Sequence, residues 1–92
     1  MILSFADKDT ELLANRVRVK KYEKIERIAL RKILQLEVAR QLSDLAIPPG
    51  NRLERLSGKR RGQYSIRINE KYRLCFIWTG GNAKQVEITD YH

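Results

Sequence analysis

The sequence contains a small set of side chains that could act together on a phosphodiester. They are Glu54, Arg67, Arg73, Asp90, Tyr91 and His92, the last three within the terminal sequence TDYH. A histidine, with an ordinary pKa of about 6.5, can give or take a proton near neutrality. A tyrosine at about 10 is a poorer base unless guanidinium groups lower its pKa. Together these groups suit cleavage of RNA by its own ribose 2′-OH, which requires a base, an acid and cations at the phosphorane.

Other kinds of chemistry find little support in the sequence. It shows no Ser-His-Asp set and no phosphate-binding loop. One cysteine, Cys75, and one histidine cannot supply the four ligands of a structural zinc site. We therefore expect a reaction that uses neither a metal nor another cofactor.

The chain is strongly basic, with 19 lysines and arginines, 11 acidic residues and a net charge of +8. Such an excess favours a polyanionic partner, because neutralising phosphates releases condensed counterions. The basic residues predicted to bind RNA gather around the segment SGKRRG: Arg55, Lys59, Arg60, Arg61 and Arg67. The alternative is a soluble basic protein whose charge has no specific partner.

The first half of the chain has the residue spacing of helices. Residues 1–5, MILSF, could form a short strand, and Asp9 or Thr10 could cap a brief helix. Apolar residues then recur at helical spacing over residues 22–45, with room for a bend. We expect the two prolines and the glycine at 48–50 to end all helical structure.

The second half of the chain has the alternating pattern of strands. Residues 64–68, 72–78 and 84–88 are predicted strands, and NRLERL at 51–56 could be a fourth. This order predicts an α+β fold, a mostly antiparallel sheet with two or three helices packed on one face. Because no repeat or linker divides the chain, we expect one domain over residues 1–92.

The alternation also predicts how the strands pair. A three-residue turn at 69–71 sets Ile66 opposite Leu74 and keeps one face of the sheet continuously apolar. It also sets Arg67 opposite Arg73 on the other face. Like charges in that position are unfavourable for the sheet, so these arginines are candidates for function.

The same register extends across the second hairpin. It predicts three further pairs: Arg73 with Thr89, Phe76 with Val86, and Trp78 with Lys84. Tyr91 would then emerge on the face of Arg73, and Cys75 shares that face by parity. Alternatively, the arginines form ordinary surface ion pairs with Glu87 or Glu70.

No segment of the sequence predicts export or membrane insertion. Charge begins at Asp7, before any apolar run reaches the length of a signal peptide. No stretch approaches the roughly 20 apolar residues that span a bilayer. We expect a cytoplasmic protein with no membrane partner.

Five stretches of the sequence, taken together, are typical of one known family. They are an opening MI-SF, a helical pair, PPGNRLE-LSG, G-YSIR-N--YR-CF-W and a terminal DYH. With these motifs nearly the whole chain resembles the HigB-type toxins of bacterial type II toxin–antitoxin modules, within the RelE/ParE superfamily. The resemblance implies a compact microbial-RNase-like fold and a ribosome-dependent endoribonuclease that cuts messenger RNA in the decoding site and inhibits translation.

The resemblance also implies the partners. A HigA-like antitoxin with a helix-turn-helix domain would neutralise the protein, and operator DNA would be bound only indirectly, through that antitoxin. The ribosome and messenger RNA would be the other partners. Whether the antitoxin covers the basic face or docks on a remote surface stays open.

Roles for single residues follow from the resemblance, position by position. Arg73 lies in the YR-CF motif, whose arginine contacts the scissile phosphate. Glu54 matches a glutamate that is the general base in YoeB-type relatives. Asp90, Tyr91 and His92 match the C-terminal motif of the family, and Tyr91 or His92 would serve as acid or stacking partner.

The sequence departs from the family pattern in the strand and loop before the first hairpin. Several ribonucleases of this group have a histidine and a lysine where this chain has Glu54 and Ser57. Loss of the lysine could lower cleavage or redirect its site, with Lys59 and Arg60 as substitutes. Alternatively, Glu54 forms an ordinary surface ion pair with a neighbouring arginine, Arg52 or Arg55.

Three other functions compete with messenger cleavage. ParE-type members of the superfamily bind DNA gyrase without catalysis, and such a protein would not need Glu54 or the terminal DYH. A weakly catalytic toxin could act mainly on ribosome assembly. DNA binding alone is disfavoured, because the helical half lacks the short glycine-containing turn of a helix-turn-helix.

Overall fold

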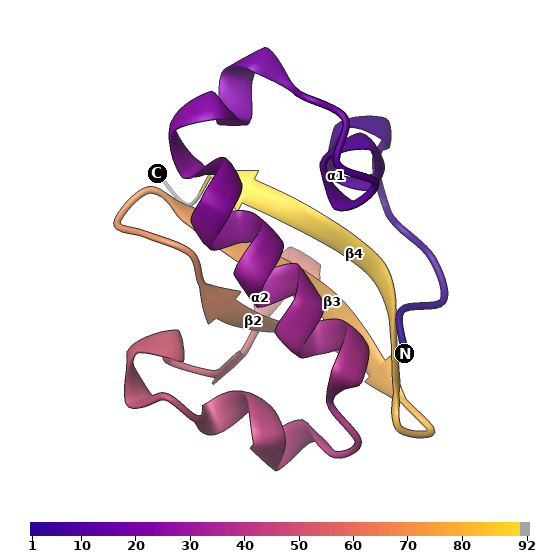
Figure 1. Cartoon of the computed structure of the whole chain (residues 1–92). Helices are drawn as coiled ribbons and strands as arrows, with labels where there is room; N and C mark the ends of the chain where they lie inside the picture. The colour runs from indigo at the N-terminus through magenta and orange to yellow at the C-terminus, as the bar shows by residue number, and fades with distance from the viewer. Residues whose placement is uncertain (91–92) are drawn as a thin grey trace.

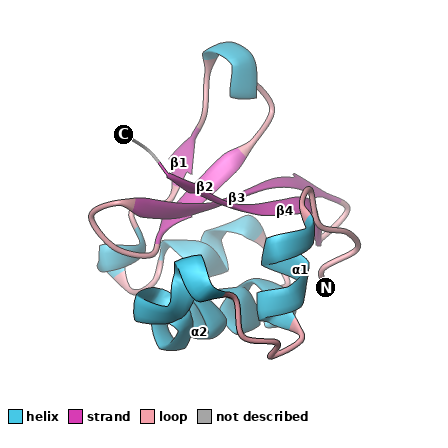
Figure 2. Cartoon of the chain, turned by 90° about the horizontal axis from the view of Figure 1, so that it is seen from above, coloured by secondary structure: helices cyan, strands magenta, loops and turns pink. Residues whose placement is uncertain are grey.

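The alternating residues of the second half form a four-stranded antiparallel sheet, and the helices pack on one of its faces (Figures 1 and 2). The computed structural model describes residues 1–90. The strands are β1 (Glu54–Arg55), β2 (Tyr64–Arg67), β3 (Tyr72–Thr79) and β4 (Asn82–Asp90), adjacent in chain order. The α+β prediction, with helices on one face of the sheet, is confirmed.

The predicted register of the first hairpin is confirmed. Ile66 lies opposite Leu74 and Arg67 lies opposite Arg73. Across the second hairpin Arg73 pairs with Thr89, also as predicted. Period-two alternation determines this pairing, since a slip of one residue would turn every apolar side chain away from the core.

The far end of the second hairpin differs from the prediction. Trp78 lies opposite Ala83, not Lys84, because the register shifts by one residue between Cys75 and Ile77. Gln85 has a positive φ of 52°, which marks the extra residue of a bulge on β4. The turn is also shorter than the gap at 79–83 between the two predicted strands, since pairing resumes at Asn82, directly after the glycines at positions 80 and 81.

In the first half of the chain, the first helix begins earlier and the long helix ends earlier than the residue spacing predicts. Helix α1 (Lys8–Ala14) is capped by Asp7, not by Asp9 or Thr10, and the Asp7 carboxylate accepts from the Thr10 N–H. A 3₁₀ turn, η1 (Lys20–Ile25), leads into α2 (Glu26–Val38). The helix ends at Val38 because Ala39 is extended.

A second 3₁₀ turn, η2 (Leu42–Ala46), follows the end of α2. The carboxylate of Asp44 accepts hydrogen bonds from the N–H groups of Arg40 and Gln41, which lowers the pKa of Asp44. Those bonds favour a new turn in place of a longer helix. The expectation that 48–50 would end all helical structure is wrong, since two short 3₁₀ turns follow: η3 (Pro49–Asn51) and η4 (Gly58–Arg60).

The hydrophobic core lies between the helices and one face of the sheet. Its fully buried apolar residues come from both layers: Leu13, Ala29, Leu36, Leu45, Ile66, Leu74, Phe76, Ala83 and Val86. Residues 1–5 lie along β4 and pair with it in parallel at Ile2–Ala83 and Phe5–Val86, close to the predicted strand (Figure 1). Within residues 1–90, no helix is long and apolar enough to cross a membrane.

Asn51 joins the segment after α2 to the helix itself. Its side chain is fully buried and donates to Gln35 Oε1 and Leu45 O, each at 3.0 Å. It also accepts a hydrogen bond from the amine of Lys32. Burial lowers the pKa of Lys32, and the charge of Arg31 lowers it further. Asn51 therefore satisfies a buried cation and several backbone groups at one point.

Replacing Asn51 by alanine should destabilise the protein by about 2–4 kcal/mol, because buried partners lose their hydrogen bonds together. The measurement is the unfolding midpoint in urea. Asn82→Ala is the matched control, since its side-chain bond to Gly80 O is exposed, and it should cost less than about 1 kcal/mol. Equal losses in the two variants would contradict this role for Asn51.

Candidate functional site

The face of the sheet that the helices leave open carries two rows of polar residues. Cross-strand partners point to the same face, so each row follows from the register. The first row runs across all four strands: Glu54, Ser65, Cys75 and Glu87. The second row runs across the three longer strands: Arg67, Arg73 and Thr89.

Arg73 is held at the centre of these rows. Its side chain is almost buried, and its residue is only 7% exposed. The Nε–H donates to Ser65 Oγ at 2.7 Å, and Nη2 donates to the backbone oxygen of Arg52 at 2.6 Å. Nη2 also lies 3.9 Å from Oε1 of Glu54. The guanidinium therefore has a hydroxyl, a carbonyl and a carboxylate around it, which fix its position.

Glu54 is the exposed member of this group. Its side chain is 51% exposed, in contrast to 9% for the side chain of Arg73. Its ion-pair partner is Arg73, not Arg52 or Arg55, the neighbours in sequence considered as alternatives. Because this carboxylate is half-exposed beside a fixed guanidinium, it could contact a group next to an anion that the guanidinium binds.

The backbone of Arg52 takes an unusual conformation to contribute its carbonyl. Its φ is 46°, in the left-handed region, directly after the turn η3. Non-glycine residues adopt this region infrequently. The turn, held by Asn51 in the core, thus delivers the Arg52 carbonyl to Arg73.

The connection between β1 and β2 rises from the open face of the sheet (Figure 2). Arg60 within it reaches β4, where its Nη1 lies 3.1 Å from Oε1 of Glu87. The same Nη1 lies 3.0 Å from Oε1 of Gln63, in the connection itself. Glu87 therefore pairs with Arg60. This is not the predicted alternative, in which Glu87 would pair with Arg67 or Arg73. The bond ties the basic connection to the far side of the site.

The remaining basic residues of the prediction lie around this connection. Arg55, Lys59 and Arg61 are exposed. Arg55 and Arg61 line a hollow of about 440 Å³ together with Ser57. Arg67 is half-buried, and its Nε–H donates to the backbone oxygen of Asn69 at 3.2 Å. Arg67 shares the open face with Arg73, whereas Arg55 lies opposite Tyr64, a residue packed against the core, and so starts from the other face of the sheet.

Asp90 is not brought to Arg73. It lies opposite Tyr72, a residue packed against the helix-side core, so its side chain belongs to the other face of the sheet. Its carboxylate is 3.8 Å from the amine of Lys71. Tyr91 and His92, the other C-terminal candidates, lie outside the described residues.

Cys75 lies in the first row, between Ser65 and Glu87, and is fully buried. Burial raises the pKa of its thiol, while Thr89 and Arg60 lower it by less. A buried, neutral thiol at this position packs the site as a small apolar side chain would.

Sequence reasoning missed Ser65 and the Arg52 carbonyl as parts of the site. Parity already places Ser65 on the face of Arg73, which is the signal that could have found it. The carbonyl had no such signal, because it depends on a left-handed backbone. Among residues 1–90, no group of three or more His, Cys, Asp or Glu side chains is arranged to hold a metal ion.

Comparison with known proteins identifies the family to which the chain belongs. A protein-family model described as the RelE-like toxin of type II toxin–antitoxin system HigB matches residues 4–92. Toxin HigB-1 of Vibrio cholerae serotype O1 is 51% identical over 59 residues, which are 64% of this chain and 62% of that protein. An uncharacterized protein of Haemophilus influenzae is 38% identical over 60 residues, 65% of this chain and 59% of the relative. The alignments thus span less than two thirds of either relative.

Solved structures share the fold at low sequence identity. Two structures of the YoeB–YefM toxin–antitoxin complex from Staphylococcus aureus each contain a chain 20% identical to this one. The TM-scores are 0.57 and 0.58, over 100% of this chain and 98% and 95% of those chains. At this identity the likeness concerns the fold alone.

Cys75 provides a direct test of how tightly the site is packed. At pH 8 the native thiol should react with Ellman's reagent at least about 100-fold more slowly than in the guanidinium-unfolded chain, because the thiolate is the nucleophile and reaction needs a local opening. No other cysteine contributes to the signal. Native reaction at the unfolded rate would show an open, loosely packed row.

Proposed function

We propose that this chain, a member of the HigB-like toxin family, is the toxin of a type II toxin–antitoxin system and acts as a ribosome-dependent endoribonuclease that cuts messenger RNA. The ribose 2′-OH would attack the adjacent phosphorus and the bond to the 5′ oxygen would break. The products are a 2′,3′-cyclic phosphate and a 5′-hydroxyl. The reaction needs a base, an acid and a cation, with no metal or other cofactor.

The observation that carries the proposal is the 3.9 Å approach of Glu54 to Arg73 on the open face. Arg73 would bind the scissile phosphate and stabilise the charge of the phosphorane. Glu54, half-exposed beside it, would take the 2′ proton as general base. Ser65 and the Arg52 carbonyl would hold the guanidinium in place before the substrate arrives.

The general acid is assigned through the family resemblance. Tyr91 or His92 would protonate the leaving 5′ oxygen or stack on a base, since both match the C-terminal motif of the family. Asp90 matches the same motif, and its place near Lys71 suits a role in fixing the end of β4 better than direct chemistry.

The ribosome would supply much of the catalytic power by positioning the messenger. Arg55, Lys59 and Arg61, exposed on β1 and on the connection that follows it, would bind RNA together with Arg67. Arg60, bound to Glu87, would shape the connection as well as add charge. Lys59 is the candidate to replace the family lysine that this chain lacks at Ser57.

The cellular setting follows from the same proposal. A single domain of residues 1–92 would act in the cytoplasm. A HigA-like helix-turn-helix antitoxin would neutralise it and would provide the contact with operator DNA.

Substitution of the central pair tests the proposal. Arg73→Ala and Glu54→Gln should each slow cleavage on programmed ribosomes about 100-fold or more, because charge stabilisation or proton transfer is lost. Mapping of messenger ends after incubation with purified toxin gives the rate. Arg18→Ala, an exposed arginine outside the site, is the charge-matched control and should cut normally. Message that stays intact with excess wild-type toxin, or full activity of Glu54→Gln, would refute the assignment.

Ser65→Ala tests whether the position of Arg73 matters. The variant should cut about 10-fold more slowly at saturating ribosomes with little change in KM, because a freed guanidinium is misplaced in the transition state. In an Arg73→Lys background the same change should have little further effect, since the bond to Ser65 is already gone. Additive losses in this double-mutant cycle would mean that Ser65 acts independently of Arg73.

A further inference from the structure

Helix α2 is apolar on two sides, but only one of them packs against the sheet. Ala29, Ile33 and Leu36 belong to the core. Leu30, Leu34 and Val38, spaced four residues apart, form a second stripe along the helix. Leu34 is 59% exposed and Val38 66% exposed. Exposed apolar residues grouped in this way mark a site of interaction with another molecule.

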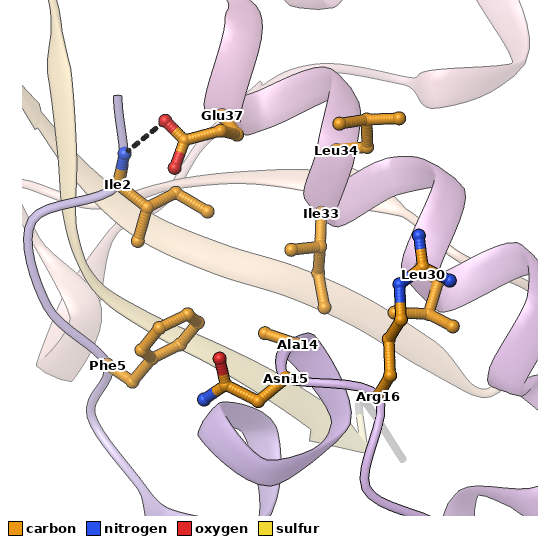
Figure 3. A pocket seen from close by; sticks show the side chains of 9 residues that line it. All are labelled: Ile2, Phe5, Ala14, Asn15, Arg16, Leu30, Ile33, Leu34 and Glu37. Carbon is orange, nitrogen blue, oxygen red and sulfur yellow. Dashed lines mark hydrogen bonds between the residues drawn. The ribbon is translucent and has the colours of Figure 1, made fainter.

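A groove continues this stripe towards the N-terminus of the chain. It has a volume of about 240 Å³ and lies between residues 1–5, the end of α1 and α2 (Figure 3). Its apolar lining includes Ile2, Phe5, Leu30 and Leu34. The N–H of Ile2 donates to Glu37 Oε2 at 3.2 Å, which closes one end of the groove. The term α1–α2 groove is used below for Ile2, Phe5, Leu30, Leu34 and Glu37, with the neighbouring Val38.

The charged residues at the borders of the α1–α2 groove are mostly arginines. Arg16 lines it directly. Arg27 and Arg31 are exposed on α2, three residues before Leu30 and Leu34, and so border the stripe. Glu37, the acidic residue in the lining, is already bonded to the backbone. A segment that fits this surface must therefore combine an apolar face with acidic residues.

The same charges argue against a second copy of the chain as the occupant. A symmetric dimer would bring the arginines of α2 towards those of its partner, and the chain carries a net charge of +8. An acidic amphipathic helix has no such conflict. Its apolar side chains at helical spacing would enter the groove, which is the usual mode of helix recognition.

We propose that the α1–α2 groove is the docking site for an acidic, amphipathic helical segment of the antitoxin. The proposal rests on membership of the toxin family and is independent of messenger cleavage. The groove lies on the helical side of the molecule, whereas Glu54 and Arg73 belong to the opposite face of the sheet.

Binding of the antitoxin encoded beside the toxin gene tests this site. Leu34→Asp and Val38→Asp should each raise the Kd, measured by titration calorimetry, at least about 10-fold, because a carboxylate replaces an apolar anchor next to acidic groups of the partner. Ile47→Asp is the matched control, since Ile47 is 69% exposed and does not line the groove. It should bind as wild type. Circular dichroism verifies that all three variants fold.

The charge of the groove has its own test. An Arg27→Glu/Arg31→Glu variant should bind more weakly and lose part of the salt dependence of the Kd. Unchanged affinity in the Leu34 and Val38 variants, equal loss in Ile47→Asp, or no binding to wild type would overturn the proposal. A wild-type dimer that Leu34→Asp dissociates would assign the groove to a second copy instead.

Cleavage by the same variants separates this proposal from the nuclease assignment. Leu34→Asp should cut messenger on ribosomes at the wild-type rate, because the groove is remote from Glu54 and Arg73. Failure of docking would leave that activity intact, and absence of activity would leave the binding result unaffected.

Discussion

The almost buried guanidinium of Arg73 is the constraint on which the open face depends. A charge removed from water must be paired and hydrogen-bonded, or its burial costs several kcal/mol. Ser65, the Arg52 carbonyl and Glu54 meet that demand from β2, from the turn before β1 and from β1. One side chain thus ties three segments together, and the same bonds place it for the proposed binding of phosphate.

The two faces of the sheet differ in the residues they carry. The helix-covered face contains the apolar core, whereas the open face holds paired charges and the basic connection anchored by Arg60 and Glu87. Helix α2 has a further, outward stripe at Leu34 and Val38 that the core does not use. A chain this small therefore has separate surfaces for the proposed binding of RNA and the proposed docking of an antitoxin.

Strand pairing could be predicted from the sequence where side-chain alternation sets the register. The bulge and the end of α2 could not, because each depends on the conformation or hydrogen bonds of a single residue. The pairing of Arg67 with Arg73 follows from alternation. The shift at Trp78 does not, because Gln85 in a left-handed conformation has no reliable signal in residue type. The break after Val38 likewise depends on Asp44 capturing backbone N–H groups that a longer helix would have used.

The sequence by itself determined the α+β class, the basic character, the family and the face on which Arg73 lies. These properties depend on composition, motifs and side-chain period, all of which are local. Only the tertiary structure decided that Glu54 stands 3.9 Å from Arg73 and that Ser65 and the Arg52 carbonyl hold the guanidinium. These relations depend on distances and angles between segments, which no spacing along the chain specifies.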